Sequence, residues 1–311
     1  MRVAERGILL KSELGEPANL PLSRMIRSSP LSRTEIIKSG NVGVVTGAAL
    51  GIGLAMCKRF AQSGTSVVMA DLPGSDLDAA VEAVRLLSPT GNAAVLAVPT
   101  DVSDPQQVRS LHDIAMARFG KVNILANNAV SRVGRGMDAD LADWRWAMEV
   151  NVWGPIQTVR AFLPDMFSSP HPGIIVNVGS KQGITNPPGH PIYNITKAAL
   201  KSYTEALEHE LRSNSANQGA GRVSAHLLVP GWTTTGKSEH KTGAWMPEQV
   251  VDTMLSAIGR GDFYIVCPDD EVTLDMDKKR ILWAAGDITE NRPPLSRWHP
   301  DYAAIAKSNC S

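Results

Sequence analysis

Cysteine is scarce in this sequence: Cys57, Cys267 and Cys310 are the only three in 311 residues, and they lie far apart. An odd number of widely separated cysteines provides neither a disulfide framework nor the short spacings of a metal site. Such sparse usage is typical of proteins in reducing compartments. We therefore expect no bound metal and a cytoplasmic location.

The sequence also has no excess of charge of one sign and no long hydrophobic run. Its 31 basic and 31 acidic residues balance, and no basic stripe suited to nucleic-acid phosphates is present. No apolar run approaches the roughly 18 residues that span a bilayer. We therefore expect neither nucleic-acid nor membrane partners, and the length allows one large α/β domain or two small ones.

Residues 1–38 differ from the rest of the chain. They are rich in Arg, Ser and Pro and show no helical or strand periodicity, so we expect a poorly structured N-terminal extension. A mitochondrial targeting role is the alternative, and Glu5, Glu13 and Glu16 argue against it.

Glycines are concentrated just after the first apolar segment, Val42–Val45, which reads as a buried strand. An amphipathic helical stretch follows them directly. A strand, a glycine turn and a helix N-terminus together present backbone N–H groups to a phosphate, and the missing Cβ atoms allow a pyrophosphate to approach. We assign cofactor contacts here to Gly47, Leu50, Gly51, Ile52 and Gly53.

The next expected strand, Ser66–Ala70, ends in Asp71. An acidic residue about 20 positions beyond a glycine turn is placed to accept hydrogen bonds from the adenosine ribose. Its charge repels a 2′-phosphate, and neither Leu50 nor Leu72–Pro73 supplies a cation, so NAD is favoured over NADP. A simple turn role for Asp71 is the alternative, because glycine follows Pro73.

Strands and helices then alternate, which predicts a Rossmann-type doubly wound parallel sheet in three layers, with helices on both faces. Ligands of such sheets bind at the carboxyl ends of the strands. We therefore place Asp101 and Val102 beside the adenine, and Asn127, Asn128 and Ala129 along the cofactor cleft. The expected elements are helices over 75–87 and 105–119 and strands over 93–98 and 122–125.

A long helical stretch over 141–166 is apolar on more than one face. We expect one side to meet the sheet and the other a second subunit, which predicts a homodimer or homotetramer. Asn151 lies in the middle of this stretch, as either a satisfied core amide or part of a water site.

Tyr193 and Lys197 lie four residues apart at the start of another helical segment, so they share a helix face. A free phenol has a pKa of about 10, and a neighbouring ammonium lowers it towards the working range of an acid/base. Ser180 follows the apolar run Ile174–Val178, which we expect to be a buried strand. A hydroxyl, a phenol and an ammonium are thus predicted to meet.

Together these residues resemble the short-chain dehydrogenase/reductase family, and the resemblance runs from about Asn41 to Cys267. It matches the branch with a TGxxxGIG turn and a YxxxK active site. The motifs that carry it are the glycine turn, Asn127–Ala129, Asn151, Ser180, Tyr193 with Lys197, and Pro230–Gly231.

The resemblance implies a catalytic set. In it Tyr193 exchanges a proton with the alcohol or carbonyl oxygen, and Ser180 hydrogen-bonds the same oxygen. Lys197 lowers the Tyr193 pKa and binds the nicotinamide ribose, while Asn151 holds a water that links Lys197 to solvent. Cofactor contacts from Tyr193 and Lys197 are therefore implied as well.

The resemblance also implies that Pro230 and Gly231 cap the nicotinamide and that Thr233 binds its carboxamide. One departure is Val130, where the family usually has glycine, and it predicts a reshaped cleft wall. Trp232 and Trp245, in the expected substrate loop, either line an apolar pocket or pack on the domain.

We expect a single catalytic domain over 39–267, followed by a C-terminal segment, 268–311. This segment should contain a helix over 269–285 and an extended arm over 292–300, which covers the active site, grips a neighbouring subunit or forms a surface strap.

The sequence therefore indicates an oxidoreductase that interconverts a small secondary alcohol and a ketone with NAD. Two alternatives are an NADPH-dependent carbonyl reductase of secondary metabolism or detoxification and a non-catalytic NAD-binding sensor or scaffold.

Overall fold

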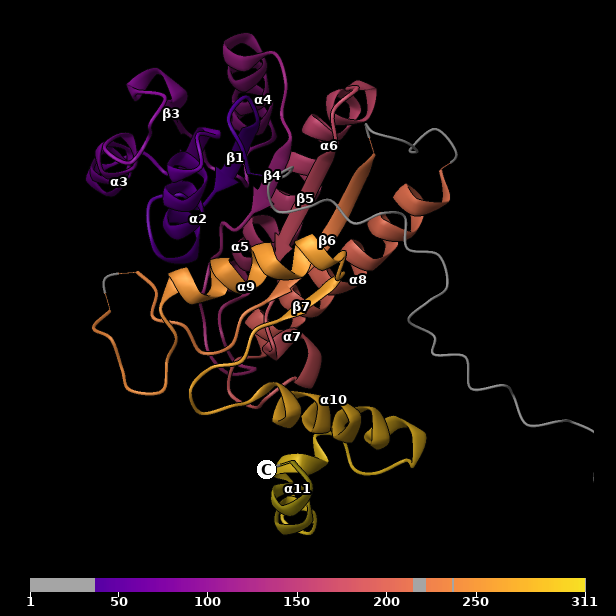
Figure 1. The fold of residues 1–311 in the computed structure, drawn as a ribbon. Coiled ribbons are helices and arrows are strands. Elements are labelled where there is room, and N and C mark those ends of the chain that lie inside the picture. Colours follow the sequence, from indigo (N-terminus) through magenta and orange to yellow (C-terminus); the bar gives the residue numbers. More distant parts are fainter. Residues whose placement is uncertain (1–36, 215–221, 237, 311) are drawn as a thin grey trace, which may run out of the picture.

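The computed structural model describes residues 37–214, 222–236 and 238–310, so most of the predicted N-terminal extension lies outside the described residues. The fold is built on a seven-stranded parallel sheet with the order β3-β2-β1-β4-β5-β6-β7, which confirms the predicted fold class (Figure 1). The strands are β1 (Val42–Thr46), β2 (Ser66–Asp71), β3 (Val95–Pro99), β4 (Ile124–Asn127), β5 (Gly173–Val178), β6 (Val223–Val229) and β7 (Tyr264–Val266).

Helices cover both faces of the sheet and complete three layers. One face carries α2 (Gly51–Gln62), α3 (Ser75–Arg85) and α9 (Pro247–Arg260), whose buried side chains join one apolar cluster. The opposite face carries α4 (Pro105–Phe119), α6 (Gly154–Ser168) and α8 (Pro191–Ser213), which share a second cluster. Short helices over Asn92–Ala94 (η2) and Gln182–Thr185 (α7) lie in the connections before β3 and after β5.

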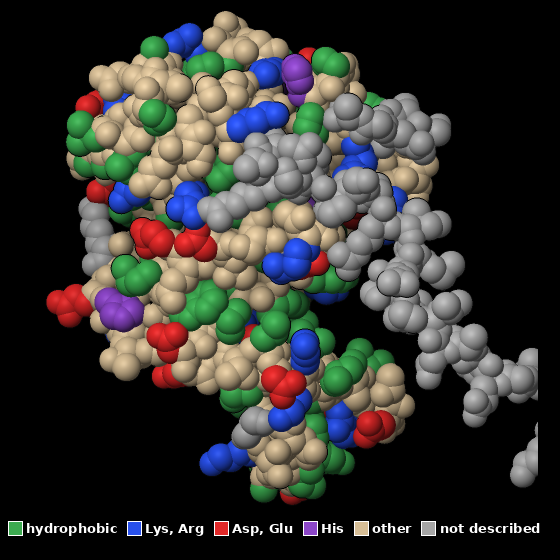
Figure 2. All heavy atoms as spheres, viewed as in Figure 1, with side chains coloured by type: hydrophobic (Ala, Val, Ile, Leu, Met, Phe, Trp, Pro, Cys, Tyr) green, Lys and Arg blue, Asp and Glu red, His purple; other side chains and the backbone are tan. Residues whose placement is uncertain are grey.

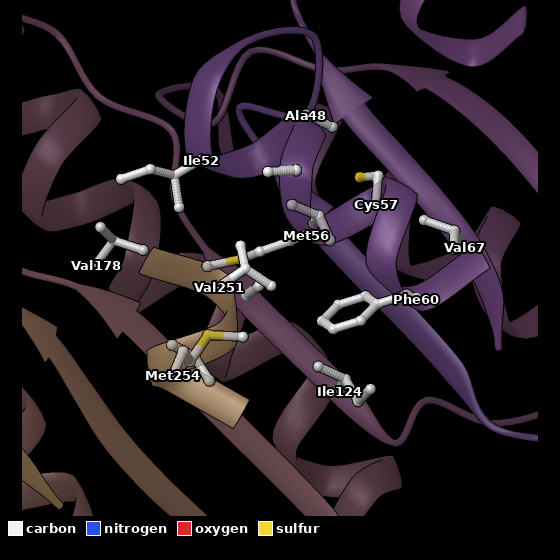
Figure 3. Packing of buried hydrophobic residues seen from close by; sticks show 14 of the residues in the cluster. Ala48, Ile52, Met56, Cys57, Phe60, Val67, Ile124, Val178, Val251 and Met254 are labelled. Atoms are coloured by element: carbon white, nitrogen blue, oxygen red, sulfur yellow. The ribbon is translucent and has the colours of Figure 1, made fainter. Parts of the chain in front are cut away.

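The first cluster holds α2 and α9 together above the sheet. Met56 of α2 lies beside Val251 and Met254 of α9, and Phe60 lies deeper, towards Ile124 of β4 (Figure 3). Burying a side chain of this size fully contributes about 1.5–3 kcal/mol. This packing fixes the position of α2, whose N-terminus faces the glycine turn.

A chain of polar side chains crosses the other face. The amide of Asn127 on β4 donates to Asn177 Oδ1 on β5 at 2.8 Å and accepts from Thr158 Oγ1 of α6 at 2.6 Å. Asn177 Nδ2 donates in turn to Thr204 Oγ1 of α8 at 2.9 Å. Because all four side chains are buried, each bond avoids an unsatisfied polar group and fixes the relative positions of the strands and helices.

The long helix expected over 141–166 is interrupted. It consists of α5 (Leu141–Met148), a π-helical segment η3 (Glu149–Trp153) and α6, and Asn151 lies in the π-helical turn. Trp146 and Trp153 are 41% and 48% exposed, so the outer side of this stretch is apolar but uncovered in the single chain. Subunit contact on this side remains a prediction.

The C-terminal segment differs from the extended arm that we expected. Helix α10 (Leu274–Thr289) is followed by a 3-10 turn over Ser296–Trp298 (η5) and a further helix, α11 (Ala303–Cys310). α10 and α11 lie beyond α7, and in the space-filling view they form a projection from the main body (Figures 1 and 2). The domain boundaries that we drew at 39 and 267 remain predictions.

Within the described part of the chain, no helix is long and apolar enough to cross a membrane, and no cluster of candidate metal ligands occurs. Acidic and basic side chains are interspersed over the face seen in Figure 2. All three cysteines are free and buried.

Candidate active site

A cavity of about 790 Å³ opens at the carboxyl ends of the strands, where the strand order reverses between β1 and β4. This is the position at which doubly wound sheets bind ligands. Of the residues that we assigned from the sequence, all but Gly53, Asn127 and Asn151 line this cavity. The assigned residues that line it are Gly47, Leu50, Gly51, Ile52, Asp71, Asp101, Val102, Asn128, Ala129, Ser180, Tyr193, Lys197, Pro230, Gly231 and Thr233.

The glycine turn brings the N-terminus of α2 to the cavity wall. Its N-cap residue, Leu50, provides no side-chain hydrogen bond, so the first amides of the helix are left for another acceptor. A Cβ on Gly53 would lie 2.0 Å from the carbonyl oxygen of Gly47, so only glycine allows the turn and the helix to pack this closely. The uncapped helix end and the glycine contact fit a bound pyrophosphate.

The end of β4 is tied to the glycine turn. The Thr46 hydroxyl accepts hydrogen bonds from the backbone N–H groups of Asn128 and Ala129 at 3.0 and 3.1 Å, and Asn128 Nδ2 donates to Gly47 O at 2.9 Å. Asn127, which we expected along the cleft, is instead the last residue of β4 and is buried in the polar chain described above.

Asp71, the last residue of β2, and Asp101, just beyond the end of β3, lie in the cavity wall. One carboxylate oxygen of Asp71 accepts from Ala49 N and the other from Leu72 N, both at 2.8 Å, so Asp71 also braces the glycine turn. The Asp101 carboxylate accepts from the backbone and hydroxyl of Ser103 at 2.9 and 2.7 Å. Both predicted positions therefore hold acidic groups at one end of the cavity.

At the other end the structure brings Ser180, Tyr193 and Lys197 together. Ser180 follows β5, and its hydroxyl oxygen accepts from Gln182 N at 3.2 Å, which leaves its proton free to be donated. The Lys197 ammonium is buried, donates to Val178 O at 2.7 Å and lies 5.7 Å from the centroid of the Tyr193 ring. The predicted shared helix face of Tyr193 and Lys197 is thus observed on α8.

The Tyr193 phenol is more acidic than an ordinary tyrosine. Burial raises its pKa, but the charges of Lys197 and Arg132, with hydrogen bonding to Ser180 and Arg132, outweigh that effect and lower it. Burial also lowers the pKa of Lys197, and the adjacent Tyr193 counteracts that shift. A phenol in this setting gives up a proton more readily near neutral pH.

Helix α7 connects the serine to the tyrosine helix. A Cβ on Gly183 would lie 2.5 Å from the backbone carbon of Lys197, so a glycine is needed where α7 crosses α8. This contact fixes the loop that starts at Ser180 against the helix that carries Tyr193.

Asn151 is fully buried and lies outside the cavity lining. Its side-chain oxygen accepts from Ser131 N at 2.7 Å, and its Nδ2 donates to Ser131 O at 2.9 Å and to Thr196 Oγ1 at 3.1 Å. Of the two interpretations drawn from the sequence, these bonds favour the satisfied core amide. Asn151 connects the π-helical turn to the loop after β4 and to α8.

The loop after β6 closes the cavity beside Ser180. Trp232 N donates to Asp269 Oδ2 at 2.9 Å, and Thr233 Oγ1 donates to Gly231 O at 3.1 Å. Trp232 lines the cavity, whereas Trp245 packs against the core and donates its ring N–H to Asp270 at 3.0 Å. Of the two tryptophans, one thus contributes to the pocket and the other to domain packing.

Sequence reasoning missed several residues of the cavity wall. Val130, which the sequence marked as a departure at the cleft wall, lines the cavity and is 45% exposed without a positive φ, whereas Arg132 and Lys181, which carry charge, were not assigned. The only signal in the sequence was their position, directly after the Asn128–Ala129 motif and after Ser180. The remaining wall residues outside the assigned set are Leu72, Thr100, Ser131, Trp146, Val150, Val178, Gly179, Gln182, Trp232, Thr235 and Gly236.

The sheet, the glycine turn and the cavity define a class of nucleotide-binding α/β oxidoreductases. The chain belongs to the short chain dehydrogenase family, whose model matches residues 41–244. Among its relatives, the 1-deoxy-11-beta-hydroxypentalenate dehydrogenase of Streptomyces avermitilis is 31% identical over 252 residues, covering 78% of this chain and 90% of that protein. The 3-oxoacyl-acyl-carrier-protein reductase of Thermotoga maritima is 30% identical over 226 residues, covering 72% and 85%.

Solved structures agree with the fold. A short-chain dehydrogenase/reductase from Burkholderia phymatum, in complex with NAD, superposes with a TM-score of 0.72 at 29% identity, covering 83% of this chain and 97% of that one. A metagenomic short-chain oxidoreductase in complex with NADP gives a TM-score of 0.61 at 23% identity, covering 74% and 97%. The chain is therefore an oxidoreductase of the short chain dehydrogenase family.

Proposed function

We propose that the protein interconverts a secondary alcohol and a ketone with NAD. The observation that supports this most directly is the Tyr193 phenol, whose pKa is lowered by the charges of Lys197 and Arg132 in spite of burial. The phenol lies in the same cavity as the uncapped end of α2. Alcohol oxidation requires an acid/base group of suitable pKa and a dinucleotide site in the same cavity.

In the proposed mechanism, Ser180 donates a hydrogen bond to the substrate oxygen, and Tyr193, as the phenolate, accepts the proton of the alcohol. Lys197 stabilises the phenolate form of Tyr193 that exists before this proton transfer, and it would contact the nicotinamide ribose. Asn151 positions the loop at Ser131 and the helix at Thr196. The bound dinucleotide supplies the hydride acceptor at its nicotinamide ring.

We assign the rest of the cavity wall to the cofactor. The pyrophosphate is assigned to Gly47, Leu50, Gly51 and Ile52, with Gly53 maintaining the close packing of the turn. The adenosine is assigned to Asp71, Asp101 and Val102, and the nicotinamide to Asn128, Ala129, Pro230, Gly231 and Thr233. The carboxylate of Asp71 supports a preference for NAD, because a 2′-phosphate beside it would meet a like charge.

The test is Tyr193→Phe, which removes the phenolic proton but keeps the ring. We expect turnover of secondary alcohols to fall by about 10³-fold or more, while NAD binding changes little. Tyr203→Phe on the same helix is the matched control, because Tyr203 packs in the core and does not line the cavity. Retained activity in Tyr193→Phe would refute the assignment of the acid/base.

Two other functions are distinguished by direct measurement. The Thermotoga relative is named as a reductase, and an NADPH-dependent reductase would show a higher kcat/KM with NADPH than with NADH. A non-catalytic sensor would bind NAD but produce no NADH with any alcohol in a panel. The buried free cysteines support a cytoplasmic location, and the exposed Trp153, which does not line the cavity, supports a homodimer or homotetramer.

A further inference from the structure

Arg132 places a positive charge in the cavity beside the phenol of Tyr193. Its guanidinium carbon lies 5.0 Å from the centroid of the Tyr193 ring, and its side chain lines the cavity and is exposed. It therefore stands at the end of the cavity that we assign to the substrate.

Arg132 hydrogen-bonds the neutral Tyr193 side chain, whereas the other cations of the cavity wall are paired with carboxylates or buried against a backbone carbonyl. Lys181 forms ion pairs with Asp269 and Asp277, and Lys197 is buried against Tyr193 and Val178 O. Among the ion pairs found in residues 37–214, 222–236 and 238–310, none involves Arg132.

The acidic groups of the wall do not neutralise this charge. Asp71 ends β2 and Asp101 follows β3, and their carboxylates accept hydrogen bonds from Ala49, Leu72 and Ser103. The cavity thus has an acidic end, assigned to the adenosine, and a cationic end at Tyr193.

The backbone that carries Arg132 is held firmly. Both the N–H and the C=O of the preceding residue, Ser131, are hydrogen-bonded to the buried amide of Asn151. A guanidinium on a fixed backbone loses less conformational entropy when it binds a ligand.

We propose that Arg132 binds a carboxylate of the substrate, so that the enzyme acts on secondary hydroxy acids and the matching keto acids. This inference rests on the proposed alcohol–ketone chemistry. A planar guanidinium with several N–H donors can bind a carboxylate through two parallel hydrogen bonds. Because Arg132 lies beside Tyr193, a carboxylate bound there would be close to the reacting carbon.

The first experiment compares secondary hydroxy acids with their methyl esters in the wild type, Arg132→Gln and the control Arg135→Gln. Arg135 lies on the same loop but does not line the cavity. We expect Arg132→Gln to lower kcat/KM for an acid about 100-fold, mainly through KM, and for its ester less than about threefold. Arg135→Gln should behave as the wild type, and the Kd for NAD should be unchanged in all three.

An equal loss for acid and ester would overturn the proposal, because Arg132 would then act only through the acidity of Tyr193. That role predicts a different signature: in Arg132→Gln the pH at which oxidation is half-maximal rises for both compounds. A weakened Kd for NAD as the main effect would likewise overturn it and assign Arg132 to the cofactor.

A second experiment does not depend on turnover. The complex of the Tyr193→Phe variant with NADH is titrated by calorimetry with pyruvate, acetoacetate and 4-oxopentanoate, and with their methyl esters. We expect at least one acid to bind about tenfold or more tightly than its ester, and this difference to disappear when Arg132→Gln is added. If no acid binds more tightly than its ester, the proposal is wrong, whereas failure of the alcohol panel alone would refute only the proposed reaction.

Discussion

A single carboxylate, that of Asp71, performs two tasks at the residue scale. It accepts a hydrogen bond from Ala49 N in the glycine turn, and it occupies the cavity wall where we place the adenosine ribose. The first task depends on a hydrogen-bond acceptor and the second on negative charge. A substitution that keeps the acceptor but removes the charge therefore separates them.

Asp71→Asn is that substitution. We expect the ratio of kcat/KM with NAD to kcat/KM with NADP to fall about tenfold, because charge-assisted hydrogen bonds to the ribose weaken and repulsion of a 2′-phosphate disappears. The unfolding midpoint should fall only slightly, because the single oxygen of Asn still accepts from Ala49 N and only the bond from the exposed Leu72 N is lost. Asp78→Asn, on the exposed side of α3, is the control. An unchanged cofactor ratio would contradict the role of Asp71.

The sequence allowed about half of the cavity wall to be predicted, because glycines after a strand and a Tyr–Lys pair on one helix face are local patterns. Arg132 and Lys181 could not be found in this way. The contribution of each charge to the site depends on which other charges lie nearby in space. The carboxylate of Asp269, which pairs with Lys181, is 88 positions away in the chain.

At the scale of elements, His112 connects α4 to α6. Its Nε2 lies 2.7 Å from Asp165 Oδ2 and its Nδ1 lies 2.9 Å from Asp113 Oδ1, and its ring meets Phe162 edge-on at 5.1 Å. Burial lowers its pKa, but Asp113 and Asp165 outweigh burial and raise it above the usual value. A histidine whose pKa is raised on folding stabilises the fold below its unfolded pKa, and loses that contribution as pH rises through the folded pKa.

We therefore expect His112→Gln to destabilise the protein more at pH 5.5 than at pH 9. The pH-dependent part should be about 1 kcal/mol or less, because the pair is partly exposed to solvent. Urea denaturation at the two pH values measures it, with His171→Gln, an exposed residue, as control. A loss of stability that is equal at both pH values would show that the charge on His112 contributes nothing.

Helix prediction succeeded where local chemistry marks the ends. α4 begins at Pro105, after an aspartate that caps it by accepting from Gln106 N, and it ends before Gly120 as expected. The π-helical turn around Asn151 was missed because one extra residue in a turn leaves the apolar pattern nearly unchanged. Helix α11 was missed because only eight residues form it.

At the scale of the whole molecule, the C-terminal segment is joined to the catalytic loop by buried charges. Lys181 Nζ, one residue after Ser180, lies 2.6 Å from Asp277 Oδ2 of α10 and 3.3 Å from Asp269 Oδ2. Asp269 also accepts from Trp232 N. The ion pairs of Lys181 could not be predicted from the sequence, because they join segments that are far apart in the chain.

Removing one partner of this cluster leaves the others charged and buried. We expect Lys181→Met to destabilise the protein by about 3 kcal/mol and to lower turnover, since Ser180 and Trp232 lose a shared anchor. Asp277→Asn should lower the free energy of unfolding by less than Lys181→Met. In the double variant the two losses of stability should not add. Lys279→Met removes the exposed partner of Asp275 and is the control. Additive losses in the denaturation midpoints would contradict the coupling.

The three buried thiols can report local unfolding, because a reagent reaches each one only when the structure around it opens. Burial raises the pKa of Cys57 and brings that of Cys267 to about 12, so neither sulfur forms an appreciable thiolate while the surrounding structure is closed. Cys57 lies in α2, which packs on the sheet, and Cys310 lies in α11, at the end of the C-terminal segment. The rate at which each cysteine is alkylated therefore measures local unfolding around it. Comparing the rates of Cys57 and Cys310 shows whether the C-terminal helices unfold before the nucleotide-binding part of the domain.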